Sequence, residues 1–384
     1  MPCASPLSHP LTHSLTHPLV QPLTHPLVQP LTHPLVQPLT HPHSSPQRKL
    51  WGATPWSPAL LTLLILLTLP ALAADATRDT WIENAGGTVT RNATGQITAV
   101  NLRASWATDT DLRHLATLPA LTGLDLSLTR ITDQGMQELR TLPGITDLNL
   151  RWAEYVTDEG IAALKSWKKL KRLVLHGTKA SDTALEHIAG ITTLETLDLG
   201  SVMLTDVGLE RLTALPNLKA LTIGGNELGD AGLQALRQMP GLTYLDLSGR
   251  QGTDSNVWAI SMSDIGLEAV LTLTQLRELR FGCTSIGVGI EGAKFATVSM
   301  MGITPRWLTQ LKSLPKLQRL KLQGCDRIDD TAVPILSSFA ALEEVDLKGT
   351  AVTDKGLAAL RAARPKLRIF SGPWDAKAAN FRNN

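Results

Sequence analysis

Cysteine, aromatic residues and an excess of charge of one sign are all scarce in this chain of 384 residues. The formal net charge is only +2, so the sequence lacks the strong positive field that is typical of nucleic-acid-binding proteins. Aromatic residues make up 4% of the chain and hydrophobic residues of all kinds make up 43%, so leucine supplies most of the apolar side chains. A compact core stops growing at about 250–300 residues, so this length favours several domains or an elongated repeat protein.

Motifs for cofactor and metal binding are also missing. The sequence contains no P-loop, no dinucleotide-binding glycine pattern, no zinc-ligand spacing and no EF-hand loop. We therefore predict no metal and no small-molecule cofactor. The longest strongly apolar run is about 15 residues, which is shorter than the span of about 20 residues that crosses a membrane.

A low-complexity stretch occupies residues 1–47. It repeats the sequence HPLVQPLT, and its regular prolines exclude a long helix or a sheet interior. We expect an extended coil, or upstream sequence read from a start codon that was assigned too early. The repeat carries histidines without a cysteine or a carboxylate, so a metal site is not expected there.

Residues 48–73 have the composition of a secretory signal peptide. Arg48 and Lys49 precede a Leu-rich stretch that ends in the sequence ALA at residues 71–73, which resembles a signal-peptidase cleavage site. An uncleaved membrane anchor is the alternative interpretation. The segment predicts a protein that is secreted or located in the periplasm or cell envelope, where disulfide bonds can form.

A unit of about 24 residues recurs over residues 97–370, in the form L-x-x-L-x-L, a turn, and then T-D-x-G-L-x-x-L-x-x-L-P. In its first half, alternation places Leu124 and Leu126 on one side of a short strand. In its second half the apolar residues fall about three positions apart, which predicts a helix of two to three turns. Thr132 and Asp133 are expected to provide the capping oxygens at the start of that helix.

Stacking of the units buries leucines that no single unit can cover. The strands are therefore expected to form one parallel sheet on the inside of a curve, with the helices outside. The predicted fold class is an α/β solenoid of horseshoe shape. The pattern resembles the leucine-rich repeat family, in the T-D-x-G-L variant of bacterial secreted repeat proteins and of the repeats in eukaryotic F-box receptors. It departs from the family pattern in the turn after each strand, where the usual Asn is expected to be absent.

Solenoid ends need caps, and both ends of the repeat region carry candidate segments. Over residues 74–96 we expect a short helix through Trp81 and then a β-hairpin. Over residues 371–384, Trp374 or Phe381 is expected to cover the last repeat.

Two insertions interrupt the repeat, near residues 249–263 and 282–302. Both enter between strand and helix in neighbouring units, so they are expected to touch each other on one rim. Their apolar residues, including Ile260 and Met262, predict an ordered binding ridge with Trp258 and Met300 as anchors. The alternative is that the two loops only pack against one another.

The exposed face of the predicted sheet points to the same region. Its middle strands carry small residues, and next to them Tyr244 and Asp246 meet a basic group formed by Arg280, Arg319 and Lys321. This patch predicts a protein partner, with an anionic glycan as a second option. A charged sheet that is only paired with its own glutamates, Glu278 and Glu344, is the alternative.

Cys283 and Cys325 fall at nearly equivalent places just after neighbouring strands. Neighbouring strands lie about 4.8 Å apart, and the Cα atoms of disulfide-bonded cysteines lie about 5.5–6 Å apart. We therefore predict a Cys283–Cys325 disulfide at the base of the larger insertion. Two buried free thiols are the alternative.

Catalytic residues are not predicted. His176 is expected on the exposed face of one strand with Asp198 on the next, but the nearest aligned hydroxyl, that of Ser127, lies two strands away on the other side. We expect a monomeric, non-enzymatic protein-binding module. The alternatives are a substrate-recruiting adaptor like the repeat part of F-box ubiquitin-ligase receptors, which needs a helical segment before the repeats, and a structural envelope protein.

Overall fold

The computed structural model describes residues 79–142, 144–249, 251–252, 257–282, 285–288, 296–299 and 302–374. The predicted low-complexity stretch, the predicted signal peptide and most of the predicted C-terminal tail lie outside these residues, as does Phe381. Among the described residues, no helix combines the length and apolar character needed to span a bilayer.

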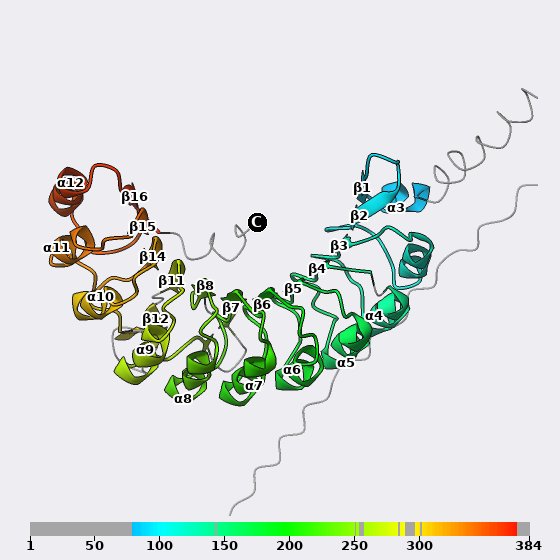
Figure 1. Cartoon of the computed structure of the whole chain (residues 1–384), viewed down its shortest axis with the longest axis horizontal. Coiled ribbons are helices and arrows are strands. Elements are labelled where there is room, and N and C mark those ends of the chain that lie inside the picture. The colour runs from blue at the N-terminus through cyan, green and yellow to red at the C-terminus, as the bar shows by residue number, and fades with distance from the viewer. Residues whose placement is uncertain are drawn as a thin grey trace, which may run out of the picture. The chain divides into compact units, whose positions relative to one another are not determined.

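A single twelve-stranded sheet runs through the whole repeat region in chain order, and its strands line the inner side of the arc in Figure 1. The first pair of strands is antiparallel and every later pair is parallel. The strands are β1 (Thr88–Arg91), β2 (Ile97–Asn101), β3 (Gly123–Asp125), β4 (Asp147–Asn149), β5 (Arg172–Val174), β6 (Thr196–Asp198), β7 (Ala220–Thr222), β8 (Tyr244–Asp246), β11 (Glu278–Gly282), β14 (Arg319–Gln323), β15 (Glu344–Asp346) and β16 (Arg368–Phe370). The predicted horseshoe solenoid is confirmed.

Short helices follow the strands on the outer side of the arc (Figure 1). The α-helices are α3 (Thr80–Asn84), α4 (Asp133–Glu138), α5 (Asp158–Ala162), α6 (Asp182–Ile188), α7 (Asp206–Arg211), α8 (Asp230–Leu233), α9 (Asp264–Leu271), α10 (Pro305–Leu311), α11 (Ala332–Ser337) and α12 (Asp354–Ala363). The 3-10 helices are η1 (Asp111–Thr117), η2 (Leu139–Thr141), η3 (Ala163–Ser166), η4 (Leu212–Ala214) and η5 (Gln234–Gln238). Four of the short α-helices therefore tighten into a 3-10 turn at their C-terminal end, a common way to end a helix.

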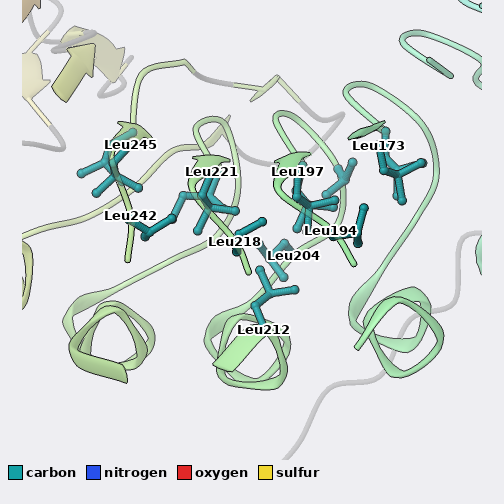
Figure 2. Close-up of a cluster of buried hydrophobic side chains, with 14 of the residues drawn as sticks. Leu173, Leu194, Leu197, Leu204, Leu212, Leu218, Leu221, Leu242 and Leu245 are labelled. Atoms are coloured by element: carbon teal, nitrogen blue, oxygen red, sulfur yellow. The ribbon is translucent and has the colours of Figure 1, made fainter. Parts of the chain in front are cut away.

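Leucines in register form the core between sheet and helices. Leu173, Leu197, Leu221 and Leu245 pair directly across strands β5 to β8, and each is fully buried. Figure 2 shows these side chains in a row at the strands, with Leu204 and Leu212 between that row and the middle helix. Because each leucine contacts the equivalent residue of the next unit, the core is one continuous row rather than a closed globule.

The turn after each strand repeats one backbone conformation. Gly177, Gly225, Gly324 and Gly349 have positive φ there, and so do four non-glycine residues at the same position of other units, namely Ala104, Leu128, Trp152 and Ser201. The prediction that this turn lacks an asparagine is wrong in one unit. Asn226 is fully buried, and its side-chain oxygen accepts hydrogen bonds from the main-chain N–H groups of Val202 and Leu204.

At most T-D-type positions the aspartate bonds to the following unit, and we refer to these aspartates as the aspartate ladder. Asp264 differs, because its carboxylate accepts from Trp307 Nε1 instead. Thr132 caps its own helix as predicted, but the carboxylate of Asp133 accepts from the main-chain N–H and hydroxyl of Thr157 and from the N–H of Gly160. The same contact links Asp109 to Thr132, Asp158 to Ser181, Asp182 to Thr205, Asp206 to Gly229, Asp230 to Ser263 and Asp330 to Thr353. The motif's glycine follows from this contact, because a Cβ on Gly160 would lie 2.4 Å from an Asp133 oxygen.

Described residues of the two predicted cap segments lie at the two ends of the solenoid. Helix α3 and the β1–β2 hairpin precede the first parallel strand, and Trp81 packs against the core. At the other end, the Trp374 side chain lies over Gly349 in the last regular turn, since a Cβ on Gly349 would meet Trp374 at 2.5 Å.

Candidate functional site

Five predicted site residues lie on three adjacent strands of the concave face. Tyr244 and Asp246 are on β8, Arg280 is on β11, and Arg319 and Lys321 are on β14. The register places Glu278 between Tyr244 and Arg319, and Arg280 between Asp246 and Lys321. The parallel sheet therefore brings these residues together, and Glu278 completes the group.

We define the arginine cluster as Tyr244, Asp246, Glu278, Arg280 and Arg319. Its centre is the buried carboxylate of Glu278, which accepts from Arg280 Nε at 2.6 Å and from Arg319 Nε at 2.5 Å. The Arg280 guanidinium also lies over the Tyr244 ring, 5.2 Å from its centroid. The sequence left open that Glu278 only pairs with the basic residues of this sheet. These ion pairs are present, but the side chains of Arg280 and Arg319 also reach the surface.

Burial has the largest effect on the pKa values of the two β8 residues in the arginine cluster, Tyr244 and Asp246. It raises the pKa of Asp246 in spite of hydrogen bonds from Ser248 and the charge of Arg280. It also raises the pKa of Tyr244, helped by the negative charge of Asp246. Glu278 behaves differently: burial alone would raise its pKa, but the hydrogen bond from Arg319 and the charge of Arg280 outweigh burial and lower it.

The raised pKa of Asp246 predicts a pH dependence of stability. The stabilisation that comes from the protonated Asp246 carboxyl is fully present below the unfolded-state pKa of about 4. It is lost as the pH rises through the folded-state pKa. Compared with Asp246→Asn, the wild type should therefore lose free energy of unfolding as the pH increases above about 4. Urea denaturation of both proteins over a pH series tests this expectation. Parallel profiles would show that the Asp246 charge does not affect folding.

Lys321 is more enclosed than its neighbours. Its side chain is 14% exposed, and its ammonium binds Glu344 and lies 5.0 Å from the centroid of the Phe370 ring. Glu344 also accepts from Arg368 at 2.6 Å. Lys321 therefore stabilises the last strands, and Arg280 and Arg319 form the accessible basic part of the predicted patch.

Small residues make a smooth strip on the concave face beside the arginine cluster. Gly200, Gly224 and Ser248 follow the ends of adjacent strands, and Gly282 is the last residue of the next strand, β11. The chain packs unusually closely here, because a Cβ on Gly224 would lie 1.5 Å from the carbonyl oxygen of Ser248. Gly200 and Gly224 are buried in this strip.

The histidine on the concave face belongs to a buried ion-pair group. His176 Nδ1 lies 3.3 Å from Asp198 Oδ1, and Arg151 donates to the other oxygen at 2.8 Å. Burial would raise the pKa of Asp198, but the hydrogen bond and charge of His176 and the charge of Arg151 lower it. The Ser127 hydroxyl donates to Asp125 instead, so this serine is not aligned as a nucleophile for His176.

A concave depression of about 200 Å³ lies over strands β1 to β5. Its polar side chains mostly bind one another: Asn149 donates to Asp125 at 2.9 Å, and Asp125 also accepts from the main chain of Ser127 at 2.8 Å. Within the described part of the chain, no group of three or more His, Cys, Asp or Glu side chains is placed to hold a metal ion.

Each insertion contains a small antiparallel hairpin that sequence patterning did not predict. β9 (Gln251–Gly252) pairs with β10 (Val257–Trp258), and β12 (Ser285–Val288) pairs with β13 (Ala296–Ser299). Ile260 and Met262 are buried core residues rather than parts of a binding ridge, because Met262 occupies the core position before the T-D-type cap. Trp258 is half-buried at the end of β10.

The remaining predicted residues of the larger insertion lie outside the described part of the chain. Met300 and Cys283 both fall there, and the contact between the two loops stays a prediction. Cys325 is buried and disulfide-bonded. Its predicted pairing with Cys283 also stays a prediction.

A group of exposed apolar residues on the strand–helix rim was missed. Trp106 is 84% exposed and Tyr155 is 54% exposed, and Leu128 is 44% exposed although its backbone has a φ of 58°. Left-handed backbone costs an L-residue about 1–2 kcal/mol, so Leu128 and Trp152 are strained where other units use glycine. For Leu128 and Trp152 the signal was available in the repeat alignment, as large residues at a position where other units have glycine.

This strain predicts that Leu128→Gly stabilises the protein. Relief of the left-handed backbone should outweigh the entropic cost of glycine and the small loss of packing, for a net gain of about 1 kcal/mol. Urea denaturation measures the change. Gly225→Ala, at the equivalent position with a φ of 76°, should instead destabilise by about 1–2 kcal/mol. A clear loss of stability in Leu128→Gly would show that its side chain contributes more than its backbone costs.

Leucine-rich repeat family profiles match the chain in several places. One profile matches residues 192–251, and a second matches residues 118–139, 145–165 and 341–360. A comparison with curated protein sequences finds no significant match.

Several solved structures resemble the chain. An internalin (inlF) from Listeria monocytogenes is 17% identical with a TM-score of 0.39, over 78% of this chain and 93% of that one. Internalin C2 from the same organism is 22% identical with a TM-score of 0.32, over 70% and 85% of the two chains. The ectodomain of the Arabidopsis receptor kinase HAESA, solved with an extended IDA peptide hormone, is 14% identical with a TM-score of 0.45, over 73% of this chain and 46% of that one. At these identities and TM-scores, the likeness says nothing about partners.

Proposed function

We propose, from the premise that this chain is a leucine-rich repeat protein, that it is an exported, non-enzymatic module that binds a protein partner. Leucine-rich repeats serve in general as protein-interaction modules, and solenoids present an extended concave surface for binding. The partner is proposed to contact the concave sheet and the adjoining strand–helix rim.

The arginine cluster is the observation that carries the proposal. Tyr244, Arg280 and Arg319 lie together on the concave face, and the units that contribute β8 and β11 also carry the two insertions. Tyrosine, tryptophan and arginine dominate binding hot spots because they combine apolar area with directional hydrogen bonds. Trp258 in the first insertion adds a half-buried aromatic residue of the same kind.

Export is the second part of the proposal. It rests on the signal-peptide composition of residues 48–73 and on the disulfide bond of Cys325, which forms stably in oxidising compartments. N-terminal sequencing of the mature protein tests it. The expected first residue is Ala74, directly after the ALA sequence, and a mature chain that retains residues 48–73 would contradict cleavage.

Shortening the insertions tests the binding proposal. The variant should remove residues between 250 and 258 and between 284 and 301, and keep the buried Ile260, Met262 and Ile303 so that the core is unchanged. We expect recovery of the protein partner on the purified shortened protein to fall at least about tenfold relative to wild type. Equal recovery would contradict a binding role for the loops, and would favour the concave sheet alone or a purely structural protein.

A further inference from the structure

Glu278 binds two arginines, and in both the contact is made by the Nε atom of the guanidinium group. Each Glu278 oxygen accepts from one Nε, that of Arg280 or that of Arg319, and the Glu278 side chain is only 7% exposed. Both guanidinium groups are therefore fixed at their inner ends. Stacking of Arg280 on Tyr244 restrains it further.

The outer ends of the two guanidinium groups keep unused donors. A guanidinium has five N–H donors, of which the Nε–H is one. Arg280 Nη1 lies 3.8 Å from Asp246 Oδ2, which is beyond hydrogen-bond distance, and Arg319 has no other hydrogen bond among the described residues. The two side chains are 31% and 40% exposed, so these donors reach the concave surface.

We infer that Arg280 and Arg319 together bind one carboxylate of the protein partner, either an acidic side chain or the C-terminal carboxylate. This inference rests on the proposed function, because it specifies what the partner presents to the arginine cluster. Guanidinium groups match the planar carboxylate and bind it with charge-assisted hydrogen bonds. Glu278 pairs with both arginines and Asp246 lies 3.8 Å from Arg280 Nη1, so the unused N–H donors rather than an excess of positive charge attract the carboxylate.

The surroundings favour a single carboxylate over a polyanion. Asp246, Glu344 and Asp346 lie on the same strands as the two arginines or on the next one. An extended anionic glycan would bring repeated charges against these carboxylates, whereas one carboxylate meets only the two arginines.

Glu278 is a positioning residue in this account, and its replacement separates two explanations. Glu278→Gln removes a negative charge, so simple electrostatic attraction predicts tighter anion binding. If Glu278 instead fixes the two guanidinium groups, Glu278→Gln should bind a carboxylate more weakly. The reason is that the guanidinium groups of Arg280 and Arg319 would no longer be held in one orientation. We expect the weaker binding.

The test is an NMR titration of the arginine Nε–H resonances of the full chain with sodium acetate at constant ionic strength. We expect saturable shifts at Arg280 and Arg319 and none at Arg237, an exposed arginine paired with Glu268 on the outer side. Arg319→Lys, which keeps the charge but loses the fork, should weaken acetate binding about tenfold, and unchanged folding is checked by the amide spectrum.

Three results would overturn the inference: no shift with acetate, shifts with heparin but not with acetate, or tighter acetate binding by Glu278→Gln. The heparin result would instead favour a glycan partner. Acetate binding does not require the partner protein. If the protein recovers its partner but does not bind acetate, only this inference is refuted. If it binds acetate but recovers no partner, the proposed function is refuted.

Discussion

Gly224→Ala should unfold the central repeats, with a loss of more than about 4 kcal/mol in the free energy of unfolding. The added Cβ would lie 1.5 Å from the carbonyl oxygen of Ser248 and 2.4 Å from its carbonyl carbon. Both are main-chain atoms, so no side-chain rotation can relieve the overlap. The Gly224 carbonyl is itself held by the N–H of Ser201 at 2.9 Å, which prevents the turn from moving away.

Gly241→Ala is the matched control for this substitution. A Cβ at Gly241 would lie 3.7 Å from the nearest atom, the carbonyl oxygen of Leu218, which is an ordinary contact. The control should therefore change stability by less than about 1 kcal/mol. Urea denaturation and soluble yield compare the two variants. A Gly224→Ala protein within about 1 kcal/mol of wild type would show that the close packing of this strip is wrong.

Asp133→Ala should cost about 2–4 kcal/mol, the second-largest effect that we expect. The substitution removes hydrogen bonds of 2.7 Å to the N–H of Thr157, 2.7 Å to its hydroxyl and 3.0 Å to the N–H of Gly160. Hydrogen bonds to a charged group are each worth about 1.5–3 kcal/mol, and water recovers part of that sum at this half-buried site. In a repeat stack the loss weakens one interface, so hydrogen exchange should increase first in the units before Thr157.

Asp354→Ala separates the inter-unit bond from ordinary helix capping. Asp354 holds the same place in the last T-D pair, but among the described residues no following T-D unit exists for its carboxylate to bind. Its removal should cost only the helix-dipole contribution, about 0.3–1 kcal/mol. If the two aspartates prove equally costly, the aspartate ladder contributes nothing beyond capping within each helix.

The sequence was sufficient to predict the fold because the repeat carries the same information many times. Leu124 and Leu126 are buried as their alternation predicted, and the concave placement of Tyr244, Arg280 and Arg319 follows from the same alternation. The partners of Asp133 were not predictable in this way. In sequence, the aspartate of a T-D pair could equally cap its own helix or bind the next unit. Only the placement of neighbouring units in the structure shows that the Asp133 carboxylate binds Thr157 of the next unit.

The site was predictable only in outline. Alternation placed Arg280, Arg319 and Lys321 on one face, but it could not show that Glu278 binds both arginines or that Lys321 is enclosed by Glu344 and Phe370. These contacts of Glu278 and Lys321 depend on side-chain rotamers, which are set by packing against residues of the neighbouring strands. The strained, exposed Leu128 was missed although the repeat alignment places it where several other units have glycine.

Site-specific photo-crosslinking tests the central claim, that a protein partner binds the concave face at the arginine cluster. Benzoylphenylalanine should replace Tyr244 or Trp258 at the proposed site, and Val207 or Ile265 on the exposed outer helices α7 and α9 as controls. After irradiation in the native extracellular or envelope fraction, we expect a discrete adduct of one protein from the Tyr244 and Trp258 positions and none from the controls. Adducts at Val207 or Ile265 with none at Tyr244 would contradict the account.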